Sequence, residues 1–144
     1  GITALKPSKN GGTREQLWRS EQMSPSTVSL VALGGKIFAI NGAGVLNVAD
    51  RATGERGWKV RISDVKANGG FSGSPVAAGK HLVAVTERGL VQIVDVSGQE
   101  GAVAGSLQLP LNAETKELVL CTPALSRGAI YVRTDSALWR VGGE

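Results

Sequence analysis

Short apolar runs separated by glycine-containing turns follow one another along the whole chain. The runs at residues 82–86 and 90–95 are rich in Val, Leu and Ile, and the turn between them contains Gly89. Runs of this length bounded by turns are typical of β-strands. Because apolar and polar residues show little strict alternation, we expect strands that are covered on both faces. The pattern therefore predicts an all-β protein built from packed sheets.

The composition supports the same class. Glycine supplies 20 of the 144 residues, about twice the usual share of roughly 7%. Glycine destabilises helix interiors by about 1 kcal/mol relative to alanine, so many glycines favour turns over helices. Hydrophobic residues make up 42% and charged residues 19%, which excludes a disordered chain. No apolar run of about 18 residues occurs, so no membrane-spanning helix is predicted.

An internal repeat organises these runs. Residues 29–50 align with residues 74–95 without a gap, and Gly44 and Asp50 meet Gly89 and Asp95. A third copy follows, in which Thr122-Pro123 stands where the second copy has Ser74-Pro75. The spacing falls in the range of about 40–50 residues that is typical of four-stranded propeller blades.

Each full copy predicts four strands. In the second copy they lie near residues 74–78, 82–86, 90–95 and 102–109. The predicted division is a single propeller segment over 1–144: the end of a preceding blade (1–20), a blade (24–63), a second blade (70–110) and three strands of a last blade (118–144). Trp18 holds the same position in its strand as Trp58.

The loop after the third strand of the first copy carries a family signature. Asp50, Thr53, Gly54 and Trp58 resemble the repeat of PQQ-like (quinoprotein-type) β-propellers. The resemblance implies an incomplete ring of four-stranded antiparallel blades. It also implies that Trp18 and Trp58 pack between neighbouring blades, with Asp50, Thr53 and Gly54 in the signature loop. A tryptophan can bury about 200 Å² and donate its N–H, which suits such a role.

No catalytic, cofactor-binding or metal-binding residue is predicted. The single histidine, His81, follows a turn and is expected to be solvated, and Cys121 lies in an apolar run and is expected to be a buried, inert thiol. Asp50 and Asp95 are expected to cap turns. The irregular segments 6–15 and 110–117 are either plain connections or binding loops.

The net charge of +4 and the pI of about 9.6 add little to the prediction of fold or function. The basic residues are scattered and aromatic residues make up only 4%, so nucleic-acid binding is not predicted. Weak attraction to an acidic partner or an anionic lipid surface stays open.

About three blades cannot close a ring, since propellers have typically 4–8. Open sheet edges promote aggregation. We therefore expect the edges to be covered by the remaining blades of a longer chain, by a protein partner, or by a second copy in a homo-oligomer.

The resemblance implies a non-catalytic scaffold or protein-interaction module. Outer-membrane assembly lipoproteins are one model, and an accessory subunit of a membrane-associated complex in the periplasm or another extracytoplasmic space is another. The first alternative is a fragment of a PQQ-dependent dehydrogenase, which requires pyrroloquinoline quinone and Ca²⁺; no residue of this chain can be assigned to either. The second alternative is a carbohydrate-binding propeller.

Overall fold

The computed structural model of the chain describes residues 1–8 and 11–142. In this part of the chain the strands form four antiparallel sheets, named A to D. Sheet A contains β1 (Ile2–Leu5) and β2 (Gln16–Ser20). Sheet B contains β3 (Val31–Leu33), β4 (Lys36–Ile40), β5 (Val45–Asp50) and β6 (Arg56–Arg61). Sheet C contains β7 (Val76–Ala78), β8 (His81–Val85), β9 (Leu90–Asp95) and β10 (Ala102–Gln108), and sheet D contains β11 (Ala124–Ser126), β12 (Ala129–Arg133) and β13 (Leu138–Val141).

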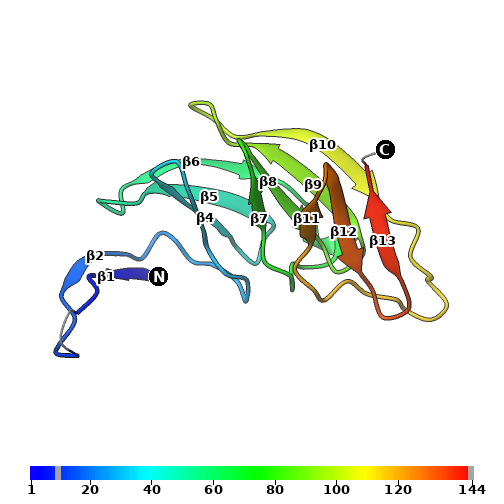
Figure 1. Cartoon of the computed structure of the whole chain (residues 1–144), viewed down its shortest axis with the longest axis horizontal. Helices are drawn as coiled ribbons and strands as arrows, with labels where there is room; N and C mark the ends of the chain where they lie inside the picture. Colours follow the sequence, from blue (N-terminus) through cyan, green and yellow to red (C-terminus); the bar gives the residue numbers. More distant parts are fainter. Residues whose placement is uncertain (9–10, 143–144) are drawn as a thin grey trace.

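The sheets follow one another in sequence order (Figure 1). Within each sheet, strands that are consecutive in sequence are neighbours in space. The short first strand β7 lies beside both β3 and β11, so the first strands share one side of the molecule. The fourth strands β6 and β10 form the opposite, outer edges. The predicted all-β fold of propeller-type sheets is confirmed, and the sheets are not closed into a ring.

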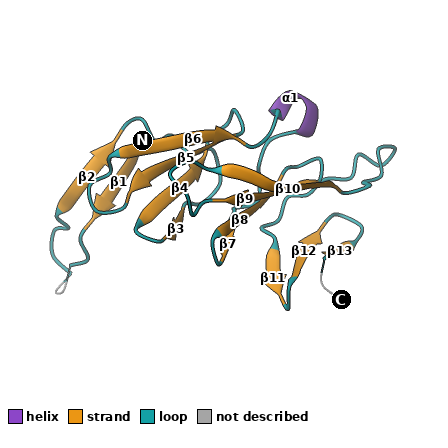
Figure 2. Ribbon diagram, turned by 90° about the horizontal axis from the view of Figure 1, so that it is seen from above, coloured by secondary structure: helices purple, strands orange, loops and turns teal. Residues whose placement is uncertain are grey.

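One short helix was not expected from the sequence. Helix α1 (Val65–Asn68) lies in the connection from sheet B to sheet C (Figure 2). It begins where the carboxylate of Asp64 accepts a hydrogen bond of 3.0 Å from the backbone N–H of Lys66. It ends at Gly69, whose φ of 74° interrupts the helical conformation.

The repeated glycines occupy turns that demand them. Gly44 and Gly89 end the turns between the second and third strands, with φ of 73° and 80°. A Cβ at Gly44 would also lie 2.4 Å from the carbonyl oxygen of Ser63. Only glycine meets both requirements at low cost.

Most of the core lies between neighbouring sheets. On β4, Phe38 and Ile40 join an apolar cluster shared with sheet C, whereas Ala39 joins a smaller cluster shared with sheet A. On β8, Leu82 contributes to the cluster with sheet B, and Val83 contributes to the cluster with sheet D. Alternate residues of one strand thus face different neighbouring sheets, which explains the continuous apolar runs.

Hydrogen bonds also join the starts of successive copies. The backbone N–H of Ser29 donates to Ser74 Oγ over 2.9 Å, and the backbone N–H of Ser74 donates to Thr122 Oγ1 over 3.0 Å. These three residues stand at the same repeat position. The aligned hydroxyl residues therefore link sheets B, C and D in order.

Two expectations about single residues need correction. Cys121 is half-buried rather than buried, and its Sγ lies 3.2 Å from the carbonyl oxygen of Arg133, to which the thiol donates. His81 begins strand β8 and is partly buried, with Nε2 3.9 Å from Asp95 Oδ2.

Among the residues that the structure describes, no helix has the length and the hydropathy that a membrane-spanning helix requires.

Candidate protein-interaction site

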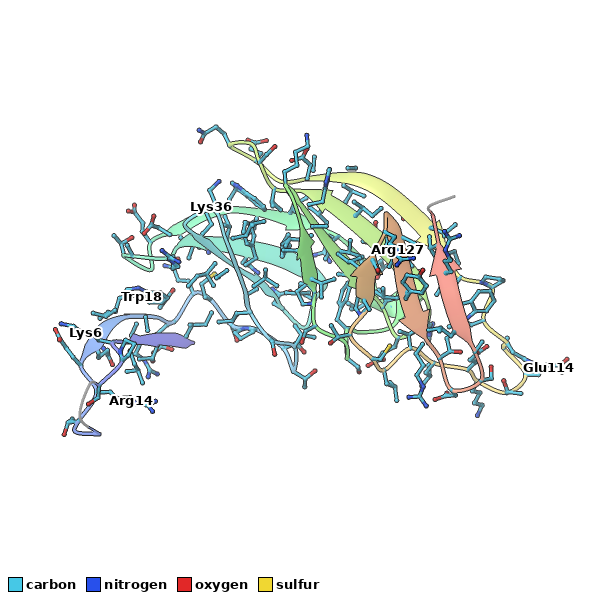
Figure 3. The ribbon with its side chains drawn as sticks, viewed as in Figure 1. Lys6, Arg14, Trp18, Lys36, Glu114 and Arg127 are labelled. Carbon is cyan, nitrogen blue, oxygen red and sulfur yellow. The ribbon has the colours of Figure 1, made fainter. Side chains whose placement is uncertain are left out.

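Trp18 of sheet A contacts the loop between β5 and β6 of sheet B. Its Nε1 donates a hydrogen bond of 3.0 Å to the carbonyl oxygen of Arg51. A Cβ on Gly54 would lie 2.5 Å from Cε3 of the indole, so the ring lies directly against this glycine. Figure 3 labels Trp18 on the β1–β2 hairpin. The structure thus brings Trp18 and Gly54 together, and their role in docking the two sheets stays a prediction.

Asp50 and Thr53 shape the loop that receives Trp18. Asp50 Oδ1 accepts hydrogen bonds from the backbone N–H groups of Ala52 and Thr53, over 2.8 and 2.9 Å. The hydroxyl of Thr53 also donates to Asp50 Oδ1 over 3.2 Å. The backbone N–H of Thr53, followed by that of Ala52, holds the pKa of Asp50 below its ordinary value. Gly54 then closes the turn with φ of 73°.

Trp58 makes the corresponding contact one sheet further on. A Cβ on Gly101, in the β9–β10 loop of sheet C, would lie 2.4 Å from Cη2 and Cζ3 of the indole. The ring of Phe38 lies 5.9 Å from that of Trp58, with the planes tilted by 50°. Unlike Trp18, Trp58 has a buried Nε1 with no hydrogen-bond partner among the described residues.

The sequence did not single out Gly101. In the second copy, the Ser97-Gly98 pair stands close to the position where the family signature has Thr-Gly. The glycine that contacts Trp58 is instead Gly101, three residues after Gly98. The longer β9–β10 loop moves the contact along the chain. The only sequence feature that could have indicated this contact is that Gly101 directly precedes the fourth strand.

Each outer strand contains an irregularity at the docking position. In sheet B the register shifts between Asn47 and Ala49, which places Trp58 in a β-bulge opposite Val48. The same shift occurs in sheet C between Val103 and Gly105. A bulge re-aims side chains and increases the local twist, so the repeated bulge presents this part of the outer strand to the next sheet.

A buried carboxylate fixes the long connection into sheet D. Glu117 is 8% exposed and accepts hydrogen bonds from the hydroxyls of Thr134 and Ser136 and, over 2.9 Å, from the backbone N–H of Asn112. These bonds, led by that of Asn112, lower the pKa of Glu117 from 4.5 to about 2. The hydrogen bonds of Glu117 therefore anchor the C-terminal end of the segment 110–117.

The first and last sheets expose apolar side chains on their outward faces. Leu138 on β13 is 70% exposed, whereas its neighbour Trp139 packs into the cluster between sheets C and D. Leu17 on β2 is 55% exposed, whereas its neighbour Trp18 faces sheet B. Consecutive strand residues point to opposite faces, so both leucines lie on the faces turned away from the other sheets.

Sheet D contains three strands among the residues that the structure describes. In sheets B and C the third strands pair with β6 and β10, but β13 pairs only with β12 within the described residues. An unpaired edge presents N–H and C=O groups that can pair with another strand. Together with the face around Leu138, this edge is the candidate interaction site.

The resemblance to quinoprotein enzymes also implies calcium and quinone ligands. The first strands β3, β7 and β11 carry only Val, Ala, Leu and Ser. No cluster of three or more His, Cys, Asp or Glu residues occurs among the residues that the structure describes. The first strands thus supply no carboxylate or amide side chain that fits a calcium ion.

Known structures share this architecture although the sequence matches no family model and no curated protein. BamB from Moraxella catarrhalis superposes with a TM-score of 0.66 at 19% identity, over 85% of this chain and 35% of that chain. A europium-containing methanol dehydrogenase gives 0.58 at 20% identity, over 78% of this chain and 22% of that chain. The quinohemoprotein alcohol dehydrogenase ADHIIG from Pseudomonas putida HK5 gives 0.62 at 15% identity, over 84% of this chain and 24% of that chain.

These likenesses establish the fold of a segment of a PQQ-like β-propeller. The chain spans between 22% and 35% of the length of the three structures. Identities of this size carry the architecture and not the activity, because one fold hosts many functions.

Proposed function

We propose that this chain belongs to a non-catalytic β-propeller scaffold that binds other proteins, as an accessory subunit of a membrane-associated, extracytoplasmic complex. The observation that carries the proposal is the outward face of sheet D, where the exposed Leu138 lies on β13, a strand that pairs only with β12 among the described residues. The structural likeness to BamB agrees with this proposal, and the sequence resemblance to outer-membrane assembly lipoproteins supports both the scaffold role and the location.

The geometry suits strand addition. An extended segment paired with β13 would take the position that β6 and β10 hold in sheets B and C. Backbone hydrogen bonds would supply affinity, and side-chain pockets on the sheet face would supply selectivity. Leu138 offers an apolar contact on that face. Its register partner on β12, the exposed Arg133, offers a positive charge.

The mass of the isolated chain in solution tests this proposal. We expect self-association of this 144-residue chain that increases with protein concentration in light-scattering measurements, because β13 pairs only with β12 among the described residues and Leu138 is exposed on it. Leu138→Lys should suppress the association, whereas Val103→Lys, at an exposed apolar position in sheet C, should leave it unchanged. A monodisperse monomer at all concentrations would contradict the need to cover this edge.

A PQQ-dependent dehydrogenase remains the second candidate, because two of the three structures above are alcohol dehydrogenases. Its test is reduction of an electron-accepting dye by alcohols, measured in the full-length protein loaded with pyrroloquinoline quinone and Ca²⁺. Quinone absorbance with Ca²⁺-dependent dye reduction would favour the enzyme. A full-length protein that shows neither, yet binds a defined partner through β13, would favour the scaffold.

A further inference from the structure

A basic groove lies along the outer strand of sheet B, on the side toward sheet A. Its volume is about 430 Å³. We name it the basic groove; it is lined by Gln22, Asn41, Val45, Asn47, Arg56, Lys59 and Arg61. The volume falls within the range of about 300–1,000 Å³ that is usual for small-molecule sites.

The bulge in β6 gathers three positive charges on one face. Arg56, Lys59 and Arg61 lie opposite Ala49, Asn47 and Val45 in the register of β5. In a regular strand, residues three apart point to opposite faces. The register shift between Asn47 and Ala49 places Arg56 on the same side as the other two cations.

These three cations form no ion pair within the described part of the chain, although Arg56 also lines a neighbouring hollow that contains Asp50 and Glu55. No described Asp or Glu lines the basic groove itself. Arg61 Nη1 donates a hydrogen bond of 2.7 Å to the carbonyl oxygen of Ala43, which holds the guanidinium in place. Arg56 and Lys59 have no acceptor among the described residues, so their donors are available to a ligand.

An amide adds a neutral donor to the groove. Asn41 Oδ1 accepts hydrogen bonds of 3.0 Å from the backbone N–H groups of Ala43 and Val45. Because the oxygen is committed to the turn, the NH₂ group is the free end of the side chain. The lining therefore combines three cations and an amide donor with no competing carboxylate.

The fold does not require these cations. The register places Val103, Ser106 and Gln108 of sheet C where sheet B has Arg56, Lys59 and Arg61. Gln108 Nε2 donates to the carbonyl oxygen of Arg88 over 2.6 Å, as Arg61 donates to that of Ala43. An uncharged amide thus makes the same hydrogen bond to the turn carbonyl as the guanidinium does. Of these two sheets, only sheet B carries positive charges at the three positions.

The groove is lined mainly by residues of β5 and β6, together with Gln22, which follows β2 in sequence. The groove thus lies at the outer edge of sheet B, away from the first strands.

We propose that the basic groove binds a phosphate-bearing ligand, either a free phosphate compound or the phosphate of a lipid headgroup. Arg56 and Lys59 would contact the anion, and Arg61 would position it with its remaining donors, because arginine and lysine form strong charge-assisted hydrogen bonds to phosphate oxygens. This inference is independent of the function proposed above.

Binding measurements with matched variants test the proposal. Inorganic phosphate and glycerol phosphate are titrated by calorimetry, and vesicles of phosphatidylcholine with or without phosphatidylglycerol are assayed by co-sedimentation. The groove variant is Arg56→Val with Lys59→Ser, which introduces the side chains found in sheet C. The control is Arg14→Val with Lys116→Ser, which removes the same two charges from exposed loops.

We expect the groove variant to weaken binding by about tenfold or more, equivalent to about 1.4 kcal/mol, and the control to leave it within about twofold. Binding of the soluble phosphates identifies a free phosphate ligand, and binding only to vesicles with phosphatidylglycerol identifies a lipid headgroup. No binding in either arm overturns the proposal, as does an equal loss in both variants, which would indicate diffuse charge. Lys59→Gln alone should reduce binding in the same direction if the double variant folds poorly.

Discussion

The contact between Trp58 and Gly101 yields a sharp prediction about packing between sheets B and C. A Cβ at residue 101 would lie 2.4 Å from two ring carbons of Trp58, whereas ordinary contacts are 3.4–4 Å. The ring would have to move by about 1 Å, and Phe38 lies against it at a centroid distance of 5.9 Å. Overpacking of this kind destabilises by about 1–3 kcal/mol. We therefore expect Gly101→Ala to lower the free energy of unfolding by about 1–3 kcal/mol.

The measurement is urea denaturation followed by tryptophan fluorescence. Gly42→Ala is the matched control, because its Cβ would meet nothing within 4 Å and its φ is outside the left-handed region. Both substitutions reduce the entropy of the unfolded chain alike, so their difference isolates the contact. In a Trp58→Phe background, which lacks the two clashing ring carbons, the loss should fall below about 0.5 kcal/mol. Equal stabilities of Gly101→Ala and Gly42→Ala, or a loss unchanged by Trp58→Phe, would refute the reasoning.

Three further predictions concern single contacts. Trp18→Phe should destabilise the chain by about 1 kcal/mol more than Trp58→Phe, because only the indole N–H of Trp18 donates to a carbonyl; equal losses in urea denaturation would contradict this. The folded chain should lose stability as the pH falls from 4.5 toward 2, because folding depresses the pKa of Glu117 to about 2; Glu117→Gln should flatten this loss in acid titrations followed by circular dichroism, and an unchanged slope would be the contrary result. Thr122→Val should cost about 0.5–1.5 kcal/mol, because the N–H of Ser74 loses its acceptor, and Thr122→Ser should restore most of it; failure of Thr122→Ser to recover stability would argue against the hydrogen bond.

Much of the strand order follows from local pattern. The apolar runs and their turns predicted β8 and β9 closely, since a strand's length and the glycine at a positive φ are recorded in neighbouring residues. The gap-free alignment of residues 29–50 with 74–95 agrees with the positions of β4 and β5. Helix α1 was missed because four residues carry no helical periodicity and depend on the cap at Asp64.

Some residues at the contacts between sheets could also be recognised from the sequence, and others could not. Asp50, Thr53 and Gly54 were recognisable from the family signature of the first copy, and Trp18 from its correspondence to Trp58. The structure places these residues in one contact region, and their docking role stays a prediction. The three strands expected in the last copy correspond to β11, β12 and β13 among the described residues. Gly101 was not recognisable, because the length of its loop differs from that of the first copy and only the approach of two sheets reveals the contact.

The sequence by itself determined the strands, their turns and the repeat, because each depends on residues a few positions apart. The tertiary structure decided which face of each strand meets which sheet, that a bulge brings Arg56 beside Lys59, and that hydroxyls of successive copies join the sheets. These features depend on the register of paired strands and on distances between sheets, so residues far apart in the chain create them together.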